Sequence, residues 1–181
     1  MRKIVGTLVG LFFMLGLVSQ AAAPVPRVAP ELKMTEPSEK QTVASGPKGK
    51  VIVIQFLFTW CPHCQNTAKW LSQLQAELGP KGSQVYGDAH DPEFATKDVA
   101  AKNKDVIGFG QYGKFPVGYA SKEAVLRFLG FSVMDQYGVP QLVVIDKKGN
   151  IQAQTRPQPA KGEIVEEPIM RALVTKLLAE K

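Results

Sequence analysis

The feature that most constrains the fold is an apolar run that ends close to the only two cysteines of the chain. Residues 51–58 (Val-Ile-Val-Ile-Gln-Phe-Leu-Phe) are rich in β-branched and aromatic side chains, which is typical of a central strand covered on both faces. Cys61 and Cys64 follow within a few residues, and Pro62 suits the first turn of a helix. Residues at helical spacing continue from there, at Thr67, Leu71, Leu74 and Leu78. The pattern predicts an α/β domain with both cysteines where a buried strand ends and a helix begins.

This placement favours redox chemistry over a structural disulfide. A helix N-terminus stabilises a thiolate at Cys61, and a thiolate is the nucleophile of disulfide exchange. Cys64 is then placed to resolve the mixed disulfide. Small exported domains held together by disulfides usually carry four or more cysteines, and so short a loop constrains the unfolded state little. We therefore predict a redox-active Cys61–Cys64 pair as the catalytic centre, with no separate cofactor.

Residues 1–23 have the pattern of a secretory signal peptide. Arg2 and Lys3 precede an apolar stretch over residues 4–18, and Ala21-Ala22-Ala23 provides a small-residue cleavage site. If it is retained, the same stretch is an N-terminal membrane anchor. Both interpretations predict export to the periplasm or cell envelope.

The 158 residues after Ala23 are enough for one domain with a hydrophobic core and too few for two. Four prolines within residues 24–40 predict a linker, so we assign residues 41–181 to the domain. Without Arg2 and Lys3 the chain has 20 basic and 16 acidic side chains, and these charges are dispersed. Dispersed charge argues against nucleic-acid binding, and we expect a monomer.

Weaker patterns complete the predicted order of elements. Strands are expected at residues 41–44, 84–86, 106–108, 141–146 and 151–155. Helices are expected at residues 91–104, 121–130 and 166–179. A parallel part followed by an antiparallel hairpin, whose turn is residues 147–150, is typical of a three-layer α/β domain.

Over roughly residues 28–181 the chain resembles exported thioredoxin-fold proteins of the TlpA/ResA type. The similarity rests on residues 51–64, on Tyr137-Gly138-Val139-Pro140, and on residues 142–151 (Leu-Val-Val-Ile-Asp-Lys-Lys-Gly-Asn-Ile). It implies a thioredoxin fold, with a central mixed β-sheet flanked by helices in three layers. It also implies a thiol–disulfide oxidoreductase that acts on exported proteins with thiols or disulfides, and a membrane redox partner that recycles the disulfide.

The resemblance also assigns roles around the cysteines. It implies that Pro140 is a cis-proline facing the disulfide and that Val139 offers backbone hydrogen bonds to an extended substrate. Proline has no N–H to donate, so it fits the first position of a strand and not its interior. Trp60 is expected to form a wall of the active-site surface.

Two residues depart from the pattern of familiar relatives. Many thioredoxin-fold enzymes place a buried acid six residues before the first cysteine, where this chain has Gln55. Gln55 cannot act as a base, and the loss of a buried negative charge favours a thiolate at Cys61. The Pro62-His63 pair resembles the strongly oxidising periplasmic disulfide-bond formers, whereas TlpA-like relatives mostly reduce disulfides. The direction of electron flow is therefore left open, and Asp88, Asp91 and Glu93 are candidates for the acid or base that serves Cys64.

The main alternative is a copper(I) chaperone that uses Cys61, Cys64 and His90, because soft thiolates suit that ion. Zinc and haem are disfavoured. A structural zinc site needs four ligands, and a c-type haem site needs histidine directly after the second cysteine, where Gln65 stands. Peroxidase activity is also disfavoured, because the peroxiredoxin branch of the superfamily has a threonine three residues before its reactive cysteine, where this chain has Phe58.

Overall fold

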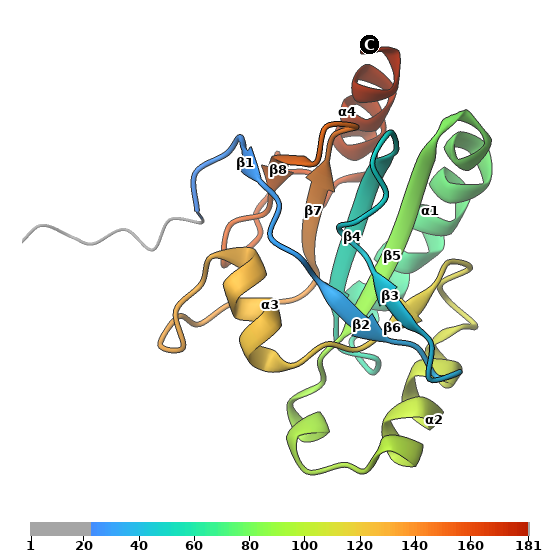
Figure 1. Ribbon diagram of the computed structural model, residues 1–181, viewed down its shortest axis with the longest axis vertical. Helices are drawn as coiled ribbons and strands as arrows, with labels where there is room; N and C mark the ends of the chain where they lie inside the picture. Colours follow the sequence, from blue (N-terminus) through green and yellow to red (C-terminus); the bar gives the residue numbers. More distant parts are fainter. Residues whose placement is uncertain (1–22, 181) are drawn as a thin grey trace, which may run out of the picture.

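The structure is a computed structural model that describes residues 23–180, so the predicted signal segment lies outside the described residues except for Ala23. Figure 1 shows a central sheet with helices α1 (Pro62–Leu78) and α4 (Glu167–Ala179) on one face and α3 (Lys122–Leu129) on the other. This is the three-layer α/β arrangement expected from the order of elements. Within residues 23–180, none of the helices is both long and apolar enough to span a bilayer.

The central sheet contains six of the strands in the described part of the chain. Their order across the sheet is β1 (Arg27–Val28), β8 (Asn150–Gln154), β7 (Gln141–Ile145), β4 (Val51–Leu57), β5 (Ser83–Ala89) and β6 (Val117–Gly118). Strands β4, β5 and β6 are parallel, whereas β7 pairs antiparallel with both β4 and β8. The predicted mixed sheet and its C-terminal hairpin are confirmed.

Strand β4 is the centre of two separate hydrophobic cores, because its side chains alternate between the two faces of the sheet. Val51, Val53 and Leu57 belong to the core beneath α1 and α4. Ile52, Ile54 and Phe56 belong to the core beneath α3. All seven residues of β4 are buried, which explains why the run in the sequence is apolar except at Gln55.

Helix boundaries follow local capping chemistry. Ser121 caps α3 by accepting a hydrogen bond from the backbone N–H of Ala124, and Gly130 ends the helix in the left-handed conformation. Helix α1 begins with Pro62 as predicted and continues to Leu78, where the 3-10 turn Gly79–Lys81 leads into β5.

The predictions for residues 91–108 were wrong in part. One helix was expected from Asp91, but a 3-10 turn at Pro92–Ala95 precedes a separate helix α2 (Val99–Phe109), which Asp98 caps. The expected strand at residues 106–108 is the last part of α2. Val106 and Phe109 are buried and Ile107 is exposed, so this short apolar run is one face of an amphipathic helix.

The segment predicted as a linker contributes two short strands in the structure. Strand β1 pairs with β8, and β2 (Lys33–Thr35) forms a separate two-stranded sheet with β3 (Gln41–Val43). Leu32 and Met34 are fully buried in the core beneath α3. Edge strands tolerate nearby prolines, so the proline content did not exclude packing against the domain.

Candidate active site at the start of helix α1

The two cysteines occupy different positions at the start of α1. Cys61 is the N-cap residue, and its sulfur accepts a hydrogen bond from the backbone N–H of Cys64 at 3.5 Å. No acidic residue lies in the first turn of the helix to oppose a thiolate. Both side chains are free thiols. Because Cys61 is the N-cap residue, its sulfur is the one that lies in the positive electrostatic field of the helix N-terminus.

Cys64 lies behind Cys61 and is fully buried, whereas Cys61 is 7% exposed. Burial raises the pKa of the Cys64 thiol strongly, and the hydrogen bond with the Cys61 side chain raises it further. Cys64 is therefore a protonated thiol at neutral pH. Cys61 is less exposed than a surface nucleophile would be, because neighbouring side chains cover most of it.

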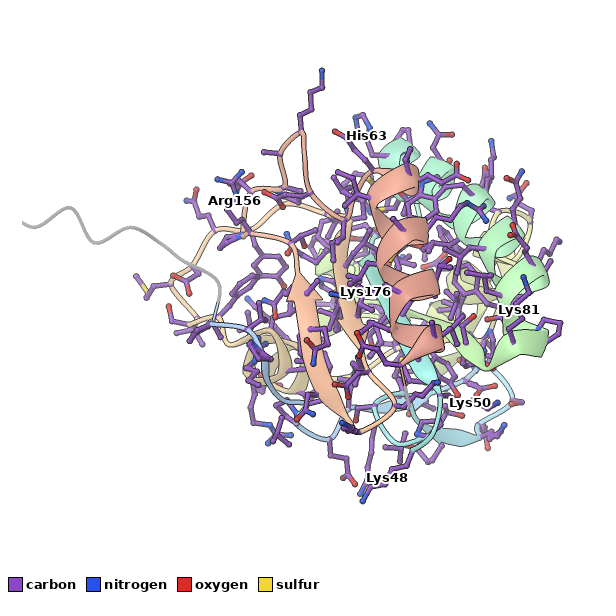
Figure 2. The ribbon with its side chains drawn as sticks, turned by 90° about the horizontal axis from the view of Figure 1, so that it is seen from above. Lys48, Lys50, His63, Lys81, Arg156 and Lys176 are labelled. Atoms are coloured by element: carbon purple, nitrogen blue, oxygen red, sulfur yellow. The ribbon has the colours of Figure 1, made fainter. Side chains whose placement is uncertain are left out.

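The surface around Cys61 is built by Trp60 and His63. The Trp60 side chain is 57% exposed and its ring lies 5.4 Å from that of Phe58. Pro62 and His63 are also exposed. Figure 2 shows His63 at the start of α1, with Lys81 beyond the opposite end of the same helix.

Gln55 lies directly behind the cysteines, as its position in the sequence predicts. It is fully buried on β4, and its side-chain nitrogen Nε2 donates a hydrogen bond to the backbone carbonyl of Cys64 at 2.9 Å. Its Oε1 atom is buried without a hydrogen-bond partner. An amide at this position holds the backbone of the helix start but offers no proton-accepting base.

Asp91 is the acidic residue that contacts the loop before Cys61, and sequence analysis had not separated it from Asp88 and Glu93. Its Oδ1 atom accepts hydrogen bonds from the backbone N–H and the hydroxyl of Thr59, at 2.9 and 2.8 Å. Burial raises the pKa of Asp91, and the charge of Asp91 in turn raises the pKa of Cys64. Asp91 is thus both a structural anchor for Thr59 and an ionisable group that acts on the second cysteine.

Val139 and Pro140 lie beside the cysteine-bearing end of β4. Strand β7 pairs Gln141 with Phe56, which places the residues just before it next to the end of β4. Val139 packs against the cluster that contains both cysteines, and the Val139–Pro140 peptide bond is cis. Within residues 23–180 the backbone of Val139 makes no hydrogen bond.

Sequence analysis missed Gln141, whose side chain holds the loop that leads into β7 in place by hydrogen bonds. Its Nε2 atom donates to the carbonyl groups of Gly138 and Pro157, at 2.7 and 3.0 Å, and its Oε1 atom accepts a hydrogen bond from the Thr155 hydroxyl at 2.7 Å. Gln141 is fully buried. A polar residue at the first position of an otherwise apolar strand was the signal that could have identified it.

His90 follows β5 and does not join the two cysteines in a metal site. Its ring packs among Phe56, Phe58 and Tyr137, with centroid distances of 5.2–6.2 Å. In the described part of the chain, no three histidine, cysteine, aspartate or glutamate side chains lie close enough together to hold a metal ion. The geometry therefore gives no support to the copper(I) alternative.

Comparisons with known proteins agree with this geometry. The AhpC/TSA family profile matches residues 25–154. The thiol-disulfide oxidoreductase ResA of Bacillus thuringiensis (strain Al Hakam) is 26% identical over 128 residues, which cover 70% of this chain and 66% of that protein. ResA of B. thuringiensis subsp. konkukian (strain 97-27) is 25% identical over 142 residues, covering 76% and 73%. The chain therefore matches just under two thirds of the first relative's length and somewhat more of the second's.

Solved structures share the fold at lower sequence identity. A protein described as a thiol:disulfide interchange protein DsbE from Chlorobium tepidum superposes with a TM-score of 0.64 and 24% identity, covering 85% of this chain and 97% of that one. A thioredoxin family protein from C. tepidum TLS gives 0.65 and 22%, covering 87% and 100%. Taken with the family match and the cysteine geometry, these likenesses lead to one conclusion. The chain belongs to the AhpC/TSA family and has the thioredoxin fold of the TlpA/ResA-type thiol-disulfide oxidoreductases.

Proposed function

We propose that this protein is an exported protein-disulfide oxidoreductase that works through the Cys61–Cys64 pair, without a separate cofactor. The observation that carries the proposal is the asymmetry of the two sulfurs. Cys61 caps α1 and receives the backbone N–H of Cys64, while Cys64 is fully buried behind it with a raised pKa. One sulfur is thus placed to attack and the other to resolve.

The proposed exchange transfers two electrons in two steps. The Cys61 thiolate attacks one sulfur of a substrate disulfide, so that a Cys61–substrate S–S bond forms and the other substrate sulfur leaves and takes up a proton. Cys64 then loses its proton and attacks Cys61, which closes the Cys61–Cys64 disulfide and releases the second substrate thiol. The protein pair is oxidised and the substrate disulfide is reduced; the reverse sequence oxidises a substrate dithiol.

Removal of the Cys64 proton needs an acceptor, and Gln55 cannot be one. We assign this role to Asp91, because it is a buried carboxyl group whose charge acts on Cys64. Its Oδ1 atom is held by Thr59 and its Oδ2 atom has no hydrogen-bond partner. A carboxyl group with a raised pKa can accept a proton near neutral pH and return it in the reverse reaction.

Substrates are proposed to be exported proteins that bind as extended segments across Val139–Pro140, Trp60 and His63. The unbonded backbone of Val139 supports this, because it is free to pair with a substrate strand. We further propose that the protein acts as a monomer in the periplasm or cell envelope and that a membrane redox partner restores the pair. The reduction potential of the Cys61–Cys64 couple, measured against glutathione, sets the direction of net transfer.

A trapping experiment tests the proposed function. The Cys64→Ser variant, mixed with a disulfide-bonded protein such as insulin, should accumulate a mixed disulfide that is visible by mass spectrometry and is removed by dithiothreitol. The Cys61→Ser variant is the matched control and should form none. Trapping by Cys61→Ser alone would reverse the roles, and trapping by neither variant would refute protein-disulfide exchange. Hydrogen peroxide consumption no faster than that of the double serine variant would separate this activity from peroxide reduction.

A further inference from the structure

A cavity opens next to the loop that precedes Cys61, and neither cysteine lines it. Its volume is about 660 Å³, within the range of about 300–1,000 Å³ typical of ligand sites. The residues after β5, the start of α3 and the loop that precedes Val139 line it. Figure 1 shows where β5 and α3 lie in the fold. The lining of the cavity includes Phe58, His90, Asp91, Tyr119, Leu126 and Tyr137.

Two side chains that line this cavity, His90 and Asp91, have buried polar atoms without a hydrogen-bond partner among the described residues. The His90 side chain is 7% exposed, and neither of its ring nitrogens forms a hydrogen bond. The Oδ2 atom of Asp91 is likewise buried without a partner. Buried polar atoms are nearly always hydrogen-bonded in folded proteins, and leaving them unbonded is costly. Their presence along a cavity indicates groups that are held ready for a ligand.

The polar groups at the His90 end of the cavity are deeply buried. Asp88 is fully buried next to His90, with 3.7 Å between Oδ1 and Nδ1, which is too long for a hydrogen bond. Burial raises the pKa of Asp88 well above its usual range and lowers the pKa of His90 to about 4. A neutral imidazole offers one donor and one acceptor. The unpartnered atoms of His90 and Asp91 therefore suit a ligand group that both donates and accepts hydrogen bonds.

The walls of the cavity are aromatic. The Phe58 and His90 rings lie 5.2 Å apart and edge to face, and the His90 and Tyr137 rings lie 5.9 Å apart. Phe94 and Tyr119 form a second edge-to-face pair at 5.9 Å. Such surfaces favour a flat ring as the ligand. A phenol hydroxyl both donates and accepts, so it can pair with either tautomer of His90.

The position of the cavity indicates that the aromatic ring it binds belongs to the substrate polypeptide. Phe58 stands three residues before Cys61, and Tyr137 stands two residues before Val139, so the cavity adjoins both sides of the proposed substrate groove. An extended chain spans about 3.3–3.6 Å per residue, which puts side chains within three residues of a substrate cysteine about 10 Å or less from it. We propose that the cavity is a recognition site for a tyrosine side chain of the substrate polypeptide, close in sequence to the cysteine that reacts with Cys61.

This inference rests on the proposed function, and peptides with one cysteine can test it. Each peptide carries 5-thio-2-nitrobenzoate in a disulfide with its cysteine, and Tyr, Phe or Ala at one of the three positions on either side. Attack by Cys61 forms the protein–peptide S–S bond, breaks the bond to thionitrobenzoate, and releases a coloured thiolate. The reaction is a single turnover of the reduced protein, so the measured quantity is the second-order rate constant of thionitrobenzoate release. At one or more positions we expect this rate constant to be about 3- to 10-fold higher for Tyr than for Phe, and at least about tenfold higher for Phe than for Ala.

Two variants separate the contribution of a hydrogen bond to His90 from that of the space available in the cavity. His90→Phe should remove the preference for Tyr over Phe and keep that for Phe over Ala. Ala95→Trp fills the cavity from an exposed lining position. It should slow thionitrobenzoate release from the Tyr and Phe peptides to the rate of the Ala peptide, and the rate of the Ala peptide should stay unchanged. Ala100→Trp, at an exposed position of α2 outside the cavity lining, is the matched control and should change none of the rates.

The outcomes distinguish this inference from the proposed function. Equal rates for the Tyr, Phe and Ala peptides at all positions in the wild type would refute the recognition site and leave disulfide exchange standing. A preference that survives Ala95→Trp would place recognition elsewhere on the surface. Failure of all peptides, including those with Ala, would instead refute thiol–disulfide exchange by Cys61. If His90→Phe does not fold, the comparison of Ala95→Trp with Ala100→Trp still decides the matter.

Discussion

The C-terminal ends of β4 and β5 lie side by side, with Leu57 paired to Ala89, but their polar groups are arranged very differently. After β4, the Thr59 backbone is bonded on both sides, by Asp91 at its N–H and by Gln65 at its carbonyl. At the end of β5, the side chains of Asp88 in the strand and of His90 just after it are buried without hydrogen bonds among the described residues. The difference suggests a division of labour in which one strand end fixes the reacting sulfurs and the other keeps polar groups available for a bound ligand.

The largest expected effect concerns the pH dependence of stability at the end of β5. The pKa of His90 is lowered to about 4, so its neutral form stabilises the folded state fully above about pH 6.5, and about 3 kcal/mol of this is lost as the pH falls to 4. Asp88 has the opposite sign. Its pKa is raised, so its contribution is present below about pH 4 and is lost as the pH rises.

Single variants should expose each contribution, measured as unfolding free energy in urea from pH 4 to 8. Relative to the wild type, Asp88→Asn should gain stability as the pH rises from 4, because asparagine does not ionise. His90→Phe should gain stability as the pH falls from 6.5 to 4, because phenylalanine takes up no proton. If the two groups instead form an ion pair, Asp88→Asn should be destabilising throughout the range, and the contrast between the two strand ends fails.

A smaller effect is expected where Asp91 connects the two ends. Asp91→Ala removes both hydrogen bonds to Thr59 and should lower the unfolding free energy by about 2 kcal/mol. Asp91→Asn keeps an acceptor oxygen and should cost less than about 1 kcal/mol. The two variants therefore separate the anchoring of Thr59 from the ionisation of Asp91.

Asp91→Asn also tests proton transfer. Release of the second substrate thiol, followed by rapid quench, should slow about tenfold or more at pH 7, while formation of the first mixed disulfide is unchanged. An unchanged resolution rate, with an unchanged pH profile, would limit Asp91 to anchoring Thr59.

The two strand ends also differ in how far the sequence predicts them. All residues of β4 are buried apolar side chains except Gln55, so the run was evident, and the two cysteines marked the turn into α1. Strand β5 was predicted only over residues 84–86, because Gly87 and Asp88 break the apolar pattern. Gly87 leaves little room for a side chain, because a Cβ there would lie 3.1–3.3 Å from side-chain atoms of Val117, Phe115 and Leu57, which would have to move slightly.

The contacts of the second strand end could not be predicted from local patterns. Asp91 and Thr59 are 32 residues apart in the chain, and no spacing rule connects them. A buried aspartate without a partner also contradicts the usual expectation that acidic residues lie at the surface. Sequence patterns are least predictive where buried polar groups serve function more than stability.

Gln55→Glu would place a buried, ionisable carboxyl group on β4, as Asp88 already is on β5. A protonated glutamic acid can still donate to the Cys64 carbonyl, whereas its ionised form cannot and is buried. We expect little change in the unfolding free energy at pH 5 and a loss of about 2 kcal/mol or more at pH 8, where ionisation is opposed by burial. Equal stability at both pH values would show that water reaches position 55.

The smallest expected effect is that of His63→Ala, because His63 is exposed and no packing depends on it. The unfolding free energy should change by less than about 0.5 kcal/mol. Thionitrobenzoate release from the alanine peptide should slow about two- to fivefold, because an imidazole next to a thiolate stabilises it by a hydrogen bond or a positive charge.

Asn66→Ala, at an exposed position on the same helix, is the matched control and should leave this rate unchanged. An unchanged rate in His63→Ala as well would mean that His63 does not stabilise the Cys61 thiolate. The electrostatic field of the helix N-terminus, which no acidic residue in the first turn opposes, would then be the main stabilisation of that thiolate.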